Sequence, residues 1–249
     1  ADLPLLDLLP PPPANESSTT KAEIDEILRL QASRTEAQAK HAIADREETL
    51  VRFLDGMGIK TEKDSLPQST ALIQRISDAE DVVTDPAKKG FARPRPPLLS
   101  AEIKPIIKLA KSGSYPSGHM TFGTAIGVVL ANMMPEKKEA IHARIKDYGE
   151  SRILAGVHYR SDLTAGQIAG TLIANTLMHN TEFLALFAPA KNELRNRSRS
   201  PVARPSQKFP PTYVPSTSSK YSTGLGVAYA ALGGFRLPKR TSTEPNITE

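Results

Sequence analysis

The chain has 249 residues, of which 39% are hydrophobic and 24% charged, and it contains no cysteine. This length allows one well-packed core or two small ones, and the lack of cysteine excludes disulfides, thiolate metal sites and a cysteine nucleophile. The net charge is +5, but residues 191–249 alone carry a net charge of +7. The basic character therefore belongs to the C-terminal segment, which argues against a globular domain that binds nucleic acid.

The first half of the chain indicates an extended leader followed by helices. Residues 1–19 are rich in proline and predict an extended Pro-rich leader. Thr20 and Glu23 match a capping box that would start the first helix. Helical spacing continues over residues 35–54 and 69–85, where we expect Pro86 to break the third helix. The prolines of residues 91–99 argue against regular structure there.

The second half predicts more helices and then a tail. Residues 121–134 and 164–178 are apolar but too short and interrupted to span a bilayer, so we expect buried helices and no transmembrane segment. No alternating strand pattern is present, and we predict an all-α compact helical bundle over residues 20–196, with the active site at helix ends. Residues 197–249 form a basic Ser/Pro-rich tail, which has too few apolar residues to fold and is expected to be flexible and disordered.

A helix N-terminus follows the sequence SGSYPSGH, residues 112–119. Ser117, Gly118 and His119 lie at the start of the 121–134 helix, where free N–H groups and the helix dipole favour an anion. A plainer interpretation also fits, in which Ser117 is only the N-cap and His119 is a satisfied core histidine.

Two further groups of charged and polar residues bear on the choice between these two interpretations. The first combines Lys88 with Arg95-Pro96, and the second is SRILAGVHYRSD, residues 151–162. Taken singly, the first could be solvated loop charges. In the second, His158 and Asp162 stand four residues apart, so on a helix they would share a face and could be a surface pair of little consequence.

Together the three segments resemble the signature of the type 2 phosphatidic acid phosphatase and vanadium haloperoxidase superfamily. That signature is Lys-x6-Arg-Pro, then Pro-Ser-Gly-His, then Ser-Arg-x5-His-x3-Asp. Only the register from Lys88 to Arg95 fits its first part, since Arg93-Pro94 would need a lysine where Pro86 stands. Within the superfamily, residues 5–196 are similar to bacterial class A non-specific acid phosphatases. The leader 8–13, the extended 113–115 turn and the lack of membrane spans carry this likeness, although Met120 replaces the usual threonine.

The resemblance implies a metal-independent acid phosphatase with no cofactor. Its phosphate-binding residues would be Lys88, Arg95, Ser117, Gly118 and Arg152. His158 would be the nucleophile that forms a phosphohistidine, Asp162 would hold its other ring nitrogen, and His119 would be the general acid and base. The expected partners are small phosphomonoester substrates and inorganic phosphate, with no nucleic acid, and a homo-oligomer is compatible with the sequence.

Three alternatives stay open at this stage. The same cage could hold vanadate in a haloperoxidase, the basic tail could bring a lipid phosphate phosphatase to an anionic membrane surface, or the fold could serve a non-catalytic interaction protein. His41, His142 and His179 are interpreted as structural. The start at Ala1 fits a periplasmic or secreted protein whose signal peptide has been removed, although a truncated chain would look the same.

Overall fold

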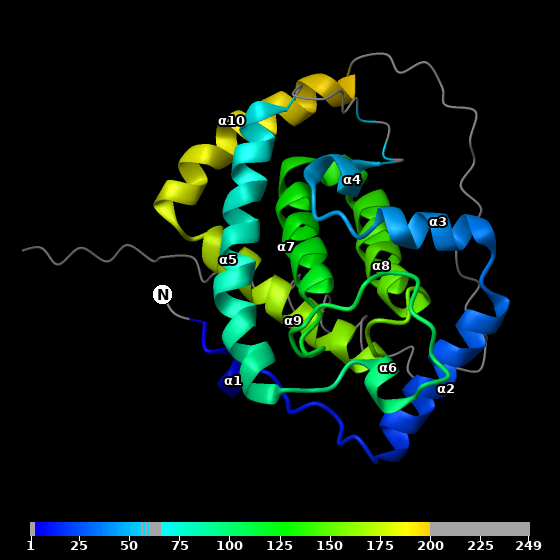
Figure 1. Cartoon of the computed structure of the whole chain (residues 1–249). Helices are drawn as coiled ribbons and strands as arrows, with labels where there is room; N and C mark the ends of the chain where they lie inside the picture. Colours follow the sequence, from blue (N-terminus) through cyan, green and yellow to red (C-terminus); the bar gives the residue numbers. More distant parts are fainter. Residues whose placement is uncertain (1–2, 56, 58, 60–65, 200–249) are drawn as a thin grey trace, which may run out of the picture. The chain divides into compact units, whose positions relative to one another are not determined.

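Helices are the only regular secondary structure among the described residues, which are 3–55, 57, 59 and 66–199 of this computed structural model. The prediction of an all-α fold is confirmed (Figure 1). All described residues belong to one compact unit. The helices are α1 (Leu5–Leu8), α2 (Ser18–Ser33), α3 (Glu36–Ala44), α4 (Leu50–Leu54), α5 (Pro67–Phe91), α6 (Pro96–Leu99), α7 (Gly118–Met133), the 3₁₀ turn η1 (Pro135–Lys137), α8 (Lys138–Leu154), α9 (Arg160–Leu177) and α10 (Thr181–Arg199).

The apolar helix α7 forms the middle of this arrangement. Figure 1 shows α7 between α5 and α8, and α7 packs against α5, α8 and α9. Phe122, Ile126 and Leu130 are fully buried along it, as expected for a helix that is apolar on all sides. None of the helices in the described part of the chain is long and apolar enough to cross a bilayer.

Two glycines of α9 bring it close to α7. A Cβ at Gly170 would lie 2.3 Å from Thr121 O, and one at Gly166 would lie 2.7 Å from Ser117 O. Any larger residue at either position would therefore separate the helices. Ser117 N also donates to Asp162 O at 3.0 Å, so the N-terminus of α7 is fixed against the first turn of α9.

Three of the predicted boundaries are wrong. Helix α5 continues through Pro86 to Phe91 instead of breaking, because Ala87 and neighbouring apolar residues are held in a small core with Leu5 and Tyr115. This places Lys88 in the last helical turn. Residues 96–99 form the single turn α6. Helix α2 starts at Ser18, and Ser17 rather than Thr20 accepts the capping bond, from Thr20 N.

The N-terminal segment was predicted to be extended, but part of it is helical. Residues 5–8 form the one-turn helix α1, which packs against α5 and buries Leu5. Tyr115 O–H donates to Pro10 O at 2.6 Å, so the proline-rich stretch is joined to the turn that precedes α7. At the other end α10 reaches Arg199. The rest of the predicted tail lies outside the described residues.

Candidate active site

His158 and Asp162 meet at the start of α9. His158 lies in the coil before the helix and Asp162 in its first turn, so the two do not lie on one helix, as the surface-pair alternative assumed. They nevertheless meet, because Asp162 folds back over the helix start. His158 Nδ1 is 3.1 Å from Asp162 Oδ2, which also accepts from Tyr159 N at 2.9 Å. Both side chains are buried.

This environment leaves His158 neutral with one nitrogen able to react. Burial lowers the pKa of His158 well below its usual value, and the positive charges of Arg95, His119, Lys88 and Arg152 lower it further. Because the Asp162 carboxylate only accepts, Nδ1 carries the proton and Nε2 keeps its lone pair. Burial raises the pKa of Asp162 to about 6, although the charge of Arg93 opposes the rise.

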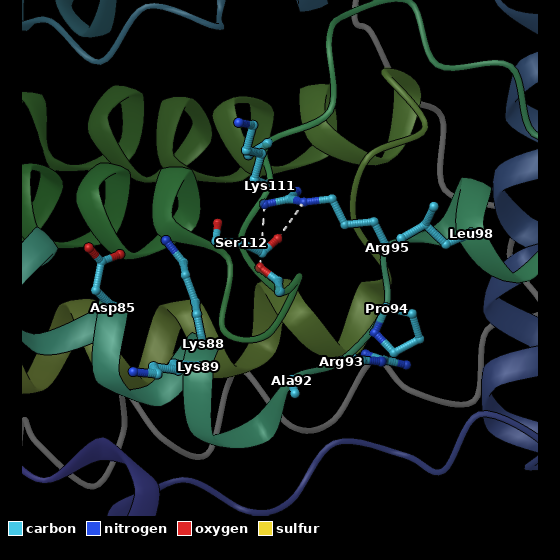
Figure 2. Close-up of a pocket in the computed structure, with 12 residues that line it drawn as sticks. Asp85, Lys88, Lys89, Ala92, Arg93, Pro94, Arg95, Leu98, Lys111 and Ser112 are labelled. Carbon is cyan, nitrogen blue, oxygen red and sulfur yellow. Dashed lines mark hydrogen bonds between the residues drawn. The ribbon is translucent and has the colours of Figure 1, made fainter.

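Arg95 lies next to the free nitrogen. Its Nη1 is 3.1 Å from His158 Nε2 and 3.1 Å from Val157 O, and its Nε donates to Ser112 O at 3.1 Å. In Figure 2 the Arg95 side chain extends toward Ser112, and the Lys88 side chain extends from α5 into the same region. Both residues line that pocket, whose volume is about 660 Å³. Backbone carbonyls therefore fix the direction of the guanidinium.

Lys88 reaches the N-terminus of α7. A Cβ at Gly118 would lie 2.7 Å from Lys88 Nζ, so a larger residue there would displace the ammonium from the helix N-terminus. The first N–H groups of α7 have no acceptor within the helix, and the helix dipole adds partial positive charge there. Lys88 Nζ is 3.9 Å from Glu80 Oε1, a buried carboxylate on the same helix. Burial raises the pKa of Glu80 to about 7, against the lowering effect of Lys88.

Ser117 is buried, and its Oγ accepts from Met120 N at 3.4 Å. This is the contact of an N-cap, and Ser117 N is already used by Asp162 O. In this structure the contacts of Ser117 are thus those of a helix N-cap, which is the plainer of the two interpretations drawn from the sequence. Its hydroxyl can still donate, because the capping contact uses it only as an acceptor.

Arg152 has the most unusual environment of the predicted residues. It lies in the last turn of α8, is 1% exposed, and donates from Nη2 to Ala42 O at 2.6 Å. Its Nε and Nη1 are buried and have no hydrogen-bond partner among the described residues. Burial lowers the pKa of Arg152. Leaving two guanidinium donors unpaired is costly, which points to an acceptor that binds there.

His119 has different contacts from His158. Its Nδ1 is 3.0 Å from Glu48 Oε1 and its Nε2 is 3.0 Å from Arg46 O. Its ring stacks on Tyr148 at a centroid distance of 5.7 Å. The His119 side chain is 21% exposed. Of the two histidines, His119 is therefore the more exposed, because the His158 side chain is only 5% exposed.

Sequence reasoning missed Arg93, Glu48 and Glu80. Arg93 was set aside because it falls outside the motif register, yet it is buried and binds Asp162 Oδ1 at 2.6 Å. Its only signal was its place two residues before Arg95. Glu48 and Glu80 lie in charged stretches of the sequence, and nothing in their spacing distinguishes them from solvated residues.

The motif serine Ser151 lies outside the cage. Its hydroxyl donates to Asp45 Oδ2 at 2.6 Å and so ties α8 to the end of α3. His41, Asp45 and Asp147 form a group whose ligand atoms lie within 4.8 Å of one another. Arg144 and Arg52 bind the Asp45 carboxylate at 2.6 and 2.7 Å, and this positive charge opposes a metal ion. Together with Arg52 of α4, the group joins α3, α4 and α8.

Several known proteins resemble this chain in sequence. Residues 78–184 match the PAP2 superfamily. A non-specific acid phosphatase of Providencia stuartii is 35% identical over 198 residues, which cover 76% of this chain and 79% of that protein. A non-specific acid phosphatase of Salmonella typhimurium is 28% identical over 199 residues, covering 76% and 80%. An acid phosphatase of Zymomonas mobilis is 28% identical over 209 residues, covering 79% and 77%.

Among solved structures, a transmembrane PAP2 type phosphatidylglycerolphosphate phosphatase from Bacillus subtilis is 17% identical, with a TM-score of 0.36, and covers 64% of this chain and 94% of that one. A likeness this distant adds nothing to the assignment. The sequence matches do decide it: the chain belongs to the PAP2 superfamily. Its place there is among the bacterial class A acid phosphatases, which are phosphoric monoester hydrolases, and the predicted resemblance is confirmed.

Proposed function

We propose that this acid phosphatase hydrolyses small phosphomonoesters without a metal ion, through a phosphohistidine on His158. The observation that carries the proposal is the pair of buried, unpaired donors of Arg152. A phosphoryl group supplies acceptor oxygens for both. Lys88 and Arg95 would add positive charge, and the N–H groups of Gly118 and His119 would complete the cage at the helix N-terminus.

The proposed reaction has two steps. In the first, His158 Nε2 attacks phosphorus, the bond from phosphorus to the ester oxygen breaks, and His119 gives a proton to the departing alkoxide. In the second, water attacks the phosphohistidine, His119 takes a proton from that water, and the P–N bond breaks to release inorganic phosphate. Fixed positive charge stabilises both transfers, since positioning and electrostatics dominate phosphoryl transfer.

Asp162 would keep His158 in the reactive tautomer. The 3.1 Å contact at Nδ1 leaves Nε2 without a proton, and the carboxylate stabilises the positive charge that the ring gains on phosphorylation. This is the role of the carboxylate in a catalytic triad. The low pKa of His158 supports the same assignment, because a protonated ring could not attack.

Rapid quenching with labelled phosphate esters tests the two histidine roles. We expect His158→Ala to lose turnover and to trap no label with any ester. We expect His119→Ala to lose on the order of 10²–10⁴-fold on alkyl phosphates, and much less on nitrophenyl phosphate, whose leaving group departs without a proton. Label trapped by His158→Ala, or an equal loss on both esters in His119→Ala, would show that the roles are wrongly assigned.

The substrates and the location remain proposals of the same kind. The relatives are named non-specific acid phosphatases, which supports small phosphomonoesters as substrates. We also propose that the protein acts in the periplasm or after secretion, as the class A resemblance implies. Fractionation of cells that express the native gene tests this, and activity confined to the cytoplasmic fraction would contradict it.

A further inference from the structure

The segment Arg46–Glu48, between α3 and α4, binds His119 at both ring nitrogens. Glu48 Oε1 is 3.0 Å from Nδ1, and Arg46 O is 3.0 Å from Nε2. A carboxylate and a backbone carbonyl can only accept hydrogen bonds. Both contacts are satisfied together only when each ring nitrogen carries a proton, which is the form that a general acid needs before it acts.

The position of this segment is set by buried contacts. Tyr148 stacks behind the His119 ring at an interplanar angle of 25°, and its O–H donates to Glu47 O at 2.7 Å. Asp45, the residue just before the segment, is fully buried and binds Arg144 at 2.6 Å. The Glu48 backbone is therefore held between α8 and α3, although the Glu48 side chain itself is 33% exposed.

Glu48 is kept ionised beside the cage. Burial alone would raise the pKa of Glu48, but the hydrogen bond and charge of His119, with the charges of Lys88 and Arg152, outweigh it and lower that pKa. The charged groups that face Glu48 are thus His119 on α7, Lys88 and Glu80 on α5, and Arg152 on α8. Only Glu80 is acidic, and it too is close to the ammonium of Lys88.

We propose that Glu48 is a positioning residue for the general acid. It holds the proton on Nδ1 and balances the charge of the protonated ring, so that the proton on Nε2 is the one given to the leaving group. Arg46 O, the present acceptor of that proton, yields its place to the ester oxygen. In the second step Nε2 regains a proton from the attacking water. This inference rests on the proposed role of His119.

The site then uses one carboxylate for each histidine, with opposite consequences. Asp162 binds a buried, neutral ring whose second nitrogen is a nucleophile. Glu48 binds a partly exposed ring whose second nitrogen still carries a proton. The sequence motif contains the first carboxylate but not the second, because Glu48 comes from a segment that precedes all three motif parts.

The test is Glu48→Gln in the full-length protein, with Glu47→Gln as the matched control. The Glu47 side chain is exposed and makes no hydrogen bond or ion pair with any described residue, so its replacement changes the same charge in the same segment. We expect Glu48→Gln to lose about tenfold in kcat on alkyl phosphates, the size of a lost hydrogen bond to a charged group, and less than about twofold on nitrophenyl phosphate.

Two further readouts separate positioning from a structural role. Because Glu48→Gln removes the negative charge next to the general acid, the high-pH limb of the alkyl phosphate profile should move to lower pH in Glu48→Gln and stay in place in Glu47→Gln. In a His119→Ala background, adding Glu48→Gln should cost no further activity, because residues that act through one another are not additive.

The outcomes distinguish this proposal from the function on which it rests. If His119→Ala shows the alkyl-to-aryl difference but Glu48→Gln behaves like Glu47→Gln, the role of Glu48 is wrong and that of His119 stands. If Glu48→Gln loses the same factor on both esters, or adds a loss to His119→Ala, Glu48 acts elsewhere. If His119→Ala itself shows no difference, both assignments fail.

Discussion

The Arg93 guanidinium binds Asp162 on the carboxylate oxygen opposite the one that holds His158. Arg93 Nη1 is 2.6 Å from Asp162 Oδ1, and His158 Nδ1 is 3.1 Å from Oδ2. Arg93 also binds Glu23 Oε2 on α2 at 3.0 Å and lies over the Tyr159 ring at 4.0 Å. The orientation of the proposed nucleophile thus depends on a buried ion-pair network that reaches the N-terminal helices.

Removal of Arg93 should destabilise the protein and slow phosphoryl transfer. Both Arg93 and Asp162 are buried, and breaking a buried pair leaves an unpaired charge, which costs on the order of 3–5 kcal/mol. We expect Arg93→Met to lose that much unfolding free energy in urea, while Arg29→Met, at an exposed position, loses less than about 0.5 kcal/mol. Equal stability of the two variants would mean that Asp162 does not need this counter-charge.

Anion binding at Arg152 should stabilise the wild-type protein. Vanadate at about 100 times its Kd is expected to add about 2.7 kcal/mol to the free energy of unfolding, because it gives partners to the unpaired donors. Arg152→Lys keeps the charge but cannot present two N–H groups in a fixed fork. Thermal unfolding with and without vanadate should therefore show the shift in wild type and in Arg75→Lys, an exposed control, but not in Arg152→Lys.

The motif residues could be predicted from sequence because their spacing is itself the signal. Lys88, Arg95, Arg152 and His158 do come together around the start of α7. The spacing could not show that α5 continues through Pro86, since that depends on packing against Leu5 and Tyr115. Nor could it show which donors of Arg152 stay unpaired.

The residues that support the motif were much harder to find. Arg93 differs from a surface arginine only by its buried partners, and those come from α2 and α9. Glu48 stands among charged neighbours in the sequence, and its contact with His119 exists only after α3 and α7 have packed on α8. Their roles depend on contacts between distant parts of the chain, which composition and periodicity do not encode.

Chelation should leave the activity unchanged. Three basic side chains surround the proposed phosphate position, and the one potential ligand group among the described residues, His41 with Asp45 and Asp147, already has Arg52 and Arg144 as counter-charges. Assays after dialysis against a chelator, with and without added divalent ions, check this. Activity that disappears on chelation and returns with an added metal would contradict the proposed mechanism.

Glu80 should make the stability of the protein fall as pH rises toward 7. Its pKa is about 7 in the folded protein and about 4.3 when unfolded, so the folded state binds the proton more tightly. The resulting contribution is complete below the unfolded pKa and is lost as pH rises through about 7. Relative to wild type, Glu80→Gln should therefore gain on the order of 1–3 kcal/mol between pH 4.5 and 8. Urea unfolding at both pH values, with the exposed Glu16→Gln as control, measures the difference, and a constant offset would rule it out.

The same carboxylate should weaken anion binding at high pH. Glu80 Oε1 is 3.9 Å from Lys88 Nζ, so above pH 7 its negative charge offsets the charge that Lys88 offers to phosphate. Below pH 7 the carboxyl is protonated and Lys88 acts on the anion alone. Inhibition by inorganic phosphate should be equal in wild type and Glu80→Gln at pH 5 but several-fold stronger in Glu80→Gln at pH 8. The exposed Glu16→Gln removes a carboxylate of the same charge at another position, and it should not reproduce this gain. If Glu80→Gln binds phosphate no better than wild type at pH 8, the ion pair of Glu80 with Lys88 does not affect phosphate binding.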